Sequence, residues 1–274
     1  VSMINPKGKF GFYRDNFSIF MKTYCDVLED NSIPLGIAEK PESYLPILVD
    51  IDLKSEEDKN LYTPNTVKEV IITYQEVLKE IILDISDDML TCVFLEKPRY
   101  KVKNIYKNGF HLHFPNIFLS KEHHTNVLIP TIKKRLIKKG VFSSDVINDV
   151  VDDCYVKNAW LLYGSKKDES LSPYLISNIY DYNYNSITAE NAFRNYKIYG
   201  DGQEIKKTKP IEYYLPYIFS IMLCDRDELV CEVKEIQEIV LPKVNNKPRS
   251  YKNLSTNMKG DLQLASKLLK VLNT

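Results

Sequence analysis

The chain has 274 residues, which is enough for one large domain or two small ones, each with its own hydrophobic core. Lysine and arginine together number 37, as do aspartate and glutamate, so the net charge is zero. Proteins that only coat nucleic acid usually carry a basic excess, so this balance argues against that class. Any contact with nucleic acid must come from local basic patches.

The five cysteines are scattered and form no CxxC pair, which argues against a zinc knuckle or ribbon. An odd, scattered count is typical of a reducing compartment. No apolar run reaches the roughly 20 residues that a transmembrane helix needs, so we expect no membrane partner. The chain starts at Val1 and ends within a helix-like run, and we expect it to be a piece of a longer protein.

The spacing of apolar residues predicts a mixture of helices and strands. In chain order the expected elements are a helix over 13–28, a strand over 44–53, a helix over 66–83, a strand over 89–95, a polar and basic segment over 97–108, a strand over 110–119, a helix over 121–139, strand-like residues over 150–162, strands over 175–184 and 196–199, and a helix-like segment over 210–223 that Pro216 breaks or kinks. The elements do not alternate strictly, so we predict an α+β fold.

A polar segment over 241–257 contains Pro242 and Pro248, which is typical of a linker. We therefore expect one domain over residues 1–240. Residues 241–274 would hold the linker and the start of a further helical region.

The strongest local feature is the sequence Val-Asp-Ile-Asp-Leu at 49–53. Side chains alternate along a strand, so Asp50 and Asp52 would share one face, with Cα atoms about 7 Å apart. Two such carboxylates repel each other unless positive charge lies between them, and their hard oxygens suit Mg²⁺ or Mn²⁺. The alternative is an amphipathic strand with a solvated face, and these five residues leave both interpretations open.

The second feature is Lys-Asn-Gly-Phe-His-Leu-His-Phe-Pro at 107–115. On a strand, His111 and His113 share one face and the apolar residues share the other. Gly109 allows close approach of a ligand or of another backbone, and Lys107 could meet a phosphate. A histidine can bind a metal or hydrogen-bond a phosphate oxygen, but it can also be a structural residue packed beside a sheet.

The third feature is Val151-Asp152-Asp153, followed by a Gly-Ser-Lys-Lys turn at 164–167. It offers a third carboxylate and a turn that could cradle a phosphate. Turns of this composition are also common on solvated surfaces, so this segment alone does not predict a site.

Two basic stretches are candidates for contact with the phosphates of a nucleic acid. Arg99, Lys101 and Lys103 alternate, so an extended segment would present all three on one side, and they are the better candidate. The second stretch, 133–139, lies near the end of a predicted helix, where positive charge is favourable in any case.

The order of the three features resembles that of the archaeo-eukaryotic primase superfamily. It runs from a hydrophobic DxD, through a Gly-x-His, to a hydrophobic Asp followed by a basic turn. The sequence is most similar to the primase domains of primase–helicases from large DNA viruses of the poxvirus and giant-virus type. The residues that carry the resemblance are VDIDL (49–53), KNGFHLHFP (107–115) and VDD…LLYGSKK (151–167). A DxD alone is a weak motif, whereas the three together are specific.

The resemblance implies a catalytic sheet like that of the RNA-recognition motif, packed with an N-terminal α/β unit. It also implies that Asp50, Asp52 and Asp152 hold two divalent ions, Mg²⁺ or Mn²⁺, with Asp153 as the alternative third ligand. His111 matches the family's histidine that contacts the phosphates of the incoming nucleotide.

The resemblance places further nucleotide contacts at Lys107, Gly109, Ser165 and Lys166. One departure concerns the stretch 154–160, where many relatives carry an arginine. Lys157 is its only cation, so nucleotide affinity or sugar discrimination could differ from that of the relatives.

The function implied is that of a DNA-dependent primase or primase–polymerase, a nucleotidyltransferase that makes primers from NTPs or dNTPs on a single-stranded DNA template by two-metal chemistry. Similar proteins continue into a C-terminal superfamily 3 helicase and act in viral DNA replication, which we expect inside the host cell, in the cytoplasm rather than the nucleus. Two alternatives stay open: a metal-dependent nuclease, and a non-catalytic DNA-binding module of the replication machinery.

Overall fold

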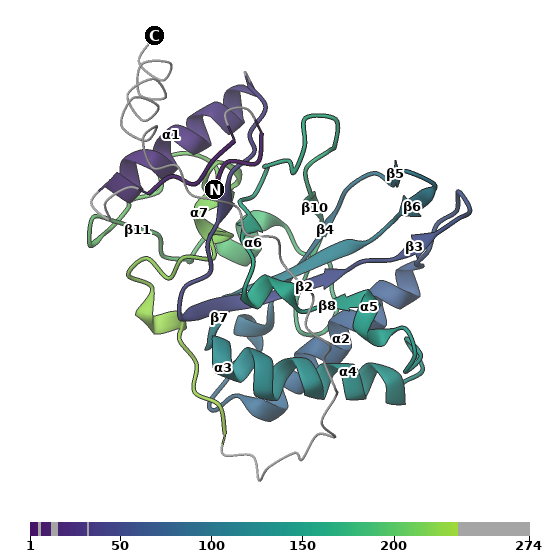
Figure 1. Ribbon diagram of the computed structural model, residues 1–274. Helices are drawn as coiled ribbons and strands as arrows, with labels where there is room; N and C mark the ends of the chain where they lie inside the picture. The colour runs from purple at the N-terminus through teal and green to yellow at the C-terminus, as the bar shows by residue number, and fades with distance from the viewer. Residues whose placement is uncertain (5–6, 12–15, 32, 235–274) are drawn as a thin grey trace.

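The computed structural model describes residues 1–4, 7–11, 16–31 and 33–234 (Figure 1). The expected linker and final helix within 241–274 lie outside the described residues. None of the described helices is long and apolar enough to cross a membrane.

The centre of the fold is a five-stranded antiparallel sheet in the order β10-β4-β7-β2-β8. Its strands are β2 (Tyr44–Ile51), β4 (Cys92–Glu96), β7 (Phe110–Ser120), β8 (Val151–Asp152) and β10 (Leu175–Tyr180). With α2 (Pro64–Ile81) and α4 (Ile129–Lys138), the order along the chain is β2-α2-β4-β7-α4-β8, the βαββαβ arrangement of ferredoxin-like folds. The expected α+β fold with an RNA-recognition-motif-like sheet is thus confirmed.

One face of the sheet packs against α2 and α4, which lie side by side below it in Figure 1. Alternate residues of the central strands enter this core and are fully buried, among them Ile51, Phe110 and Phe114. The intervening residues, including Asp50 and His111, therefore project from the opposite face. The period-two pattern of these strands separates a core face from a polar face.

The opposite face is partly covered by a second layer, seen at the upper left of Figure 1. It contains α1 (Phe17–Asp30), α6 (Ala189–Phe193) and α7 (Leu215–Ile218), which pack on residues of β4. The expected N-terminal α/β unit is therefore α1 with β1 (Ala38–Glu39), and segments that follow β10 complete it. Beyond this layer, the polar face remains partly accessible.

A small three-stranded sheet extends β2 and β7 at one end. Its strands are β3 (Lys54–Ser55), β5 (Tyr100–Val102) and β6 (Ile105–Lys107), in the order β3-β6-β5. Gly109 lies where β6 passes into β7, and a Cβ atom there would sit 1.9 Å from the carbonyl oxygen of Ile51. Glycine is therefore required for the close approach of two backbones. Of the two partners expected for Gly109, a ligand or another backbone, the structure shows the backbone.

Several elements are shorter than the sequence pattern predicts. The region 121–139 is divided into α3 (Lys121–His123), a π-helical turn (His124–Leu128) and α4, because Pro130 lacks the N–H group that a regular helix would use. The strand-like region 150–162 is β8, a 3₁₀ turn, and β9 (Trp160–Leu161), which pairs with β1. Pro216 stands at the start of α7 instead of kinking it.

The remaining elements are short. They are α5 (Ile147–Val150), β11 (Tyr199–Gly200), β12 (Gln203–Glu204), and 3₁₀ turns at Asp87–Leu90, Cys154–Val156, Ile211–Tyr214 and Asp227–Leu229. Of the strand expected over 196–199, only its last residue is extended and paired.

Candidate active site

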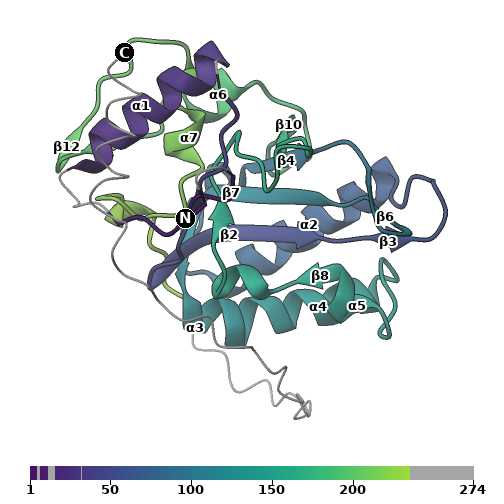
Figure 2. The same ribbon diagram turned by 45° about the horizontal axis from the view of Figure 1, so that its top comes forward.

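The register of three adjacent strands places three of the predicted site residues in a row. In the antiparallel pairs of β2, Asp50 stands opposite His111 of β7 and opposite Asp152 of β8. Directly opposed residues of antiparallel strands point to the same face, with Cβ atoms about 5 Å apart. Figure 2 shows β2 lying between these two neighbours. Side chains from three distant parts of the sequence therefore meet on the polar face.

The third carboxylate of this row is Asp152 and not its neighbour Asp153. Asp153 forms an ion pair of 3.0 Å with Lys133 of α4, a helix that covers the opposite face of the sheet. One oxygen of Asp152 accepts a hydrogen bond from the backbone N–H of Cys154, at 2.8 Å. The geometry thus favours the first of the two residues left open by the sequence.

Asp52 follows the end of β2 and reaches the lysines of the small sheet. Its Oδ2 lies 3.0 Å from Nζ of Lys107 and 3.1 Å from Nζ of Lys54, and these two lysines are register partners across β3 and β6. The carboxylate of Asp52 is therefore already compensated by two cations within the protein.

Asp50 lies among groups that stabilise its ionised form. Burial alone would raise the pKa of Asp50, but His111, with its Nε2 at 3.4 Å, together with Lys97 and Lys107, outweighs burial and lowers that pKa. Burial in turn lowers the pKa of Lys97 to about 8, although Asp50 opposes this change, and Lys167 and Lys107 contribute to it. The polar face thus combines carboxylates with several nearby lysines.

Lys97 and Lys167 were not singled out from the sequence. Lys97 directly follows β4, whose last residue pairs with the first residue of β7, so strand pairing carries it toward Asp50. Its only signal in the sequence was its place in the basic segment 97–108.

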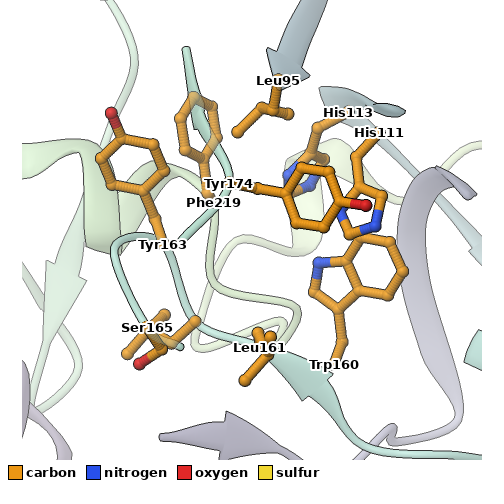
Figure 3. Close-up of a pocket in the computed structure, with 10 residues that line it drawn as sticks. Leu95, His111, His113, Trp160, Leu161, Tyr163, Ser165, Tyr174 and Phe219 are labelled. Carbon is orange, nitrogen blue, oxygen red and sulfur yellow. The ribbon is translucent and has the colours of Figure 1, made fainter. Parts of the chain in front are cut away.

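The ring of His111 is held between two aromatic rings, also not foreseen from the sequence. Tyr174 stacks on it with centroids 3.5 Å apart and an interplanar angle of 21°, and Trp160 lies on it at 4.5 Å. Figure 3 shows Tyr174 and Trp160 beside His111. The ammonium group of Lys97 in turn lies 4.4 Å from the ring centres of Tyr174 and Tyr100.

In the Gly-Ser-Lys-Lys turn, the hydroxyl of Ser165 is held by hydrogen bonds within the protein. The Ser165 hydroxyl is buried, lies 2.8 Å from the Tyr24 hydroxyl and accepts a hydrogen bond from the backbone N–H of Ile37. It therefore fastens the turn to α1 and to the strand region before β1. Lys166 lines a separate surface pocket, and the neighbouring Lys167 is the residue close enough to Lys97 to affect its pKa.

The three basic residues proposed for DNA contact do not share one side. Lys103 has a φ of 56° in the turn between β5 and β6, so the extended segment ends before it and the alternation argument fails there. Lys101 pairs with Tyr106, whereas the adjacent Tyr100 pairs with Lys107, so Lys101 points away from the carboxylates. Arg99 forms an ion pair with Asp58 at 2.6 Å.

The chemistry of the donor set fits a divalent cation. Asp50 and Asp152 are opposite each other on adjacent strands, and Asp52 follows directly after β2; all three are carboxylates of the type that Mg²⁺ and Mn²⁺ prefer. A tighter group of possible ligand atoms, within 4.8 Å of one another, consists of Asp152, Asp153 and Cys154. These three are neighbours in sequence, one is paired with Lys133, and a thiol is too soft for these ions.

Comparison with known proteins identifies the family of the chain. The family model of the C962R protein N-terminal AEP domain matches residues 1–180, which include all three motif segments. The chain is 31% identical to putative helicase 121R of Invertebrate iridescent virus 3 over 289 residues, covering 97% of this chain and 30% of that protein. It is 33% identical to putative helicase 184R of Invertebrate iridescent virus 6 over 248 residues, covering 81% of this chain and 25% of that protein.

A third relative is putative helicase L207/L206 of Acanthamoeba polyphaga mimivirus, 28% identical over 225 residues that cover 77% of this chain and 22% of that protein. The chain thus spans less than a third of the length of these curated relatives. From the family match and the shared identity over nearly its full length, the chain belongs to the family of C962R-type N-terminal AEP domains, within the archaeo-eukaryotic primase superfamily.

Proposed function

We propose that this domain is a DNA-dependent primase or primase–polymerase that joins NTPs or dNTPs on a single-stranded DNA template. The observation that carries the proposal is the register that sets Asp50 between His111 and Asp152. A row of carboxylates beside an imidazole and several lysines is suited to nucleotidyl transfer, because that reaction brings a triphosphate and a hydroxyl together.

In this proposal Asp50, Asp52 and Asp152 hold two Mg²⁺ or Mn²⁺ ions. Such ions, when bound, lower the pKa of a hydroxyl nucleophile and neutralise the charge of the triphosphate. Asp50 supports this role because the surrounding cations keep it ionised. Asp52 would exchange one or both of its lysine partners for this role.

His111 and the lysines would position the triphosphate. The imidazole of His111, fixed between Tyr174 and Trp160, would donate a hydrogen bond to a phosphate oxygen. Lys97, Lys107 and Lys167 would supply positive charge where negative charge develops during transfer. None of these side chains needs to form a covalent bond with the substrate.

The template and the helicase belong to the proposal as well. The relatives are named putative helicases, and this chain covers only part of each, so we propose that the full-length protein joins this domain to a helicase for viral DNA replication. Lys101, which points away from the carboxylates, and the nearby Arg99 are the proposed contacts for the template phosphates.

The test is incorporation of labelled NTPs and dNTPs, compared side by side on unprimed and primed single-stranded DNA with Mg²⁺ or Mn²⁺. We expect Asp50→Asn to lower incorporation by at least about 100-fold, because it removes a central negative charge from the site. The matched control is Asp30→Asn, an exposed carboxylate at the end of α1, which should leave incorporation unchanged.

Equal incorporation by the wild type and Asp50→Asn would refute the proposal. Cleavage of DNA in the absence of nucleotides, lost in the same variant, would favour a nuclease instead. Binding of DNA without metal-dependent binding of nucleotide would favour a non-catalytic module.

A further inference from the structure

A small cavity lies beside His111, between β7 and the second layer of the fold (Figure 3). Its volume is about 30 Å³, and its walls are mostly apolar and aromatic, including Leu95, Tyr163 and Phe219. A water molecule needs a cavity of roughly 10–15 Å³ by this measure, so the space admits one or two small polar groups. It is too small for a nucleobase.

His113 is one of the residues that line this cavity, and it carries an unsatisfied polar atom. Its side chain is 3% exposed, and its Nε2 has no hydrogen-bond partner among the residues that the structure describes. Buried polar atoms almost always have a partner, so an unpaired nitrogen on a residue that lines a cavity calls for an explanation. The contrast is His124, equally buried, whose two nitrogens lie 3.0 Å from the Tyr155 hydroxyl and 3.2 Å from the Leu45 carbonyl oxygen.

The charge state of His113 indicates which kind of chemical group could form a hydrogen bond with its Nε2. Burial, with smaller contributions from Arg226 and His111, lowers the pKa of His113 to about 3, so its ring is neutral at physiological pH. A neutral imidazole in an apolar pocket suits a neutral hydroxyl, which can both donate and accept, better than a phosphate, whose charge would lose its solvation there.

The position of His113 relative to the proposed phosphate site is the second argument. His111 and His113 project from the same face of β7 two residues apart, which separates their Cα atoms by about 7 Å. The sugar hydroxyls and the phosphates of one nucleotide are separated by a comparable distance. A nucleotide whose phosphates meet His111 can therefore direct a sugar hydroxyl toward His113.

We propose that the cavity at His113 is a subsite for a sugar hydroxyl of the nucleotide and that Nε2 of His113 forms a hydrogen bond with it. This inference rests on the proposed function, because it assumes that a nucleotide binds at His111. His113 would then be a determinant of sugar selectivity.

The experiment measures dissociation constants of ATP, dATP and ddATP by calorimetry with Mg²⁺ and without DNA, so that no transfer occurs. The pair ATP and dATP reports on the 2′-hydroxyl, and the pair dATP and ddATP reports on the 3′-hydroxyl. We expect the wild type to bind the nucleotide with the recognised hydroxyl about three- to tenfold more tightly, as for one hydrogen bond.

The variant His113→Leu should equalise the two dissociation constants by weakening only the nucleotide that carries the recognised hydroxyl. It should fold, because it replaces an unpaired polar group with an apolar one in an apolar surrounding. His113→Gln, whose amide can replace Nε2, should keep part of the preference. The control His124→Leu, outside the cavity, should lower thermal stability and leave the preference intact.

Equal binding of all three nucleotides by the wild type, or an unchanged preference in His113→Leu, would overturn the subsite. Those outcomes leave the proposed function standing, because nucleotide still binds. Failure of the wild type to bind any of the three nucleotides would overturn the proposed function and the subsite with it.

Discussion

The two faces of the central sheet are formed by the same strands but have different surroundings. Toward α2 and α4, side chains such as Ile51 and Phe114 are fully buried in an apolar core. One residue earlier in the same strands, Asp50 and His113 face the other side, among lysines, aromatic rings and a cavity. Substitutions on the first face should therefore change stability, and those on the second should change ligand binding and activity.

The largest loss of stability is expected from substitution of Gly109, because the backbone contact at this residue holds together the two strands that form both faces. A Cβ atom there would meet the Ile51 carbonyl oxygen at 1.9 Å, so Gly109→Ala must push β2 and β7 apart. We expect the free energy of unfolding to fall by more than about 4 kcal/mol, measured by denaturant titration. The control is Gly11→Ala, where no atom lies within 4 Å of the new Cβ. Similar stabilities of the two variants would contradict the role given to Gly109.

The second-largest loss of stability is expected from a substitution that affects only the core face. Phe114→Ala removes a fully buried ring that stacks on Tyr74 of α2, and should cost about 3–5 kcal/mol of unfolding free energy. The protein that remains folded should bind nucleotide like the wild type, as measured by calorimetry below the unfolding temperature. A selective loss of nucleotide binding without loss of stability would show that the two faces are not separable.

A smaller, pH-dependent effect is expected in the second layer, where Glu39 is buried. Burial raises the pKa of this carboxyl to about 6, although hydrogen bonds from Ser220 and Ile221 and the charge of Arg226 oppose the rise. Between pH 4.5, its ordinary pKa, and about 6 the folded protein binds more protons than the unfolded chain, so stability falls as pH rises through this window.

The difference between the two pKa values of Glu39 corresponds to about 2 kcal/mol, which is fully lost above pH 6. Thermal unfolding of the wild type and of Glu39→Gln from pH 4 to 7 measures it, because the variant lacks this titration. Parallel curves for the two proteins would contradict the prediction.

The smallest effect on stability is expected from Asp153→Asn, which breaks a partly exposed ion pair with Lys133. We expect a change in unfolding free energy of less than about 1 kcal/mol and unchanged nucleotide incorporation. Asp152→Asn, one residue away on the other face, should abolish incorporation with equally little effect on stability. The reverse result would make Asp153 the third metal ligand.

Local pattern was enough to predict the α+β class, the long helix and the central strands, because their apolar residues repeat with the period of a helix or a strand. It also put Asp50 and Asp52 on one face. The meeting of Asp50 with His111 and Asp152 depends on strand pairing across about 100 residues, which only the family resemblance supplied.

Some positions were predicted neither by the sequence pattern nor by the family resemblance, because they depend on the conformation of individual turns. The left-handed backbone at Lys103 ends the expected extended segment. In the Gly-Ser-Lys-Lys turn, the hydroxyl of Ser165 is hydrogen-bonded within the protein, whereas Lys167 lies close enough to Lys97 to affect its pKa. The rings that enclose His111 come from Trp160 and Tyr174, which lie in short segments without a repeating pattern.

That enclosure has a consequence for how a ligand would bind. A histidine on an open strand samples several rotamers, and a ligand that needs one of them must restrict the rest, at a cost in side-chain entropy. Because Tyr174 and Trp160 already restrict the ring of His111, that loss occurs during folding. The imidazole is preorganised before any phosphate arrives, so shortening either aromatic side chain should slow productive capture without altering the charge of the pocket.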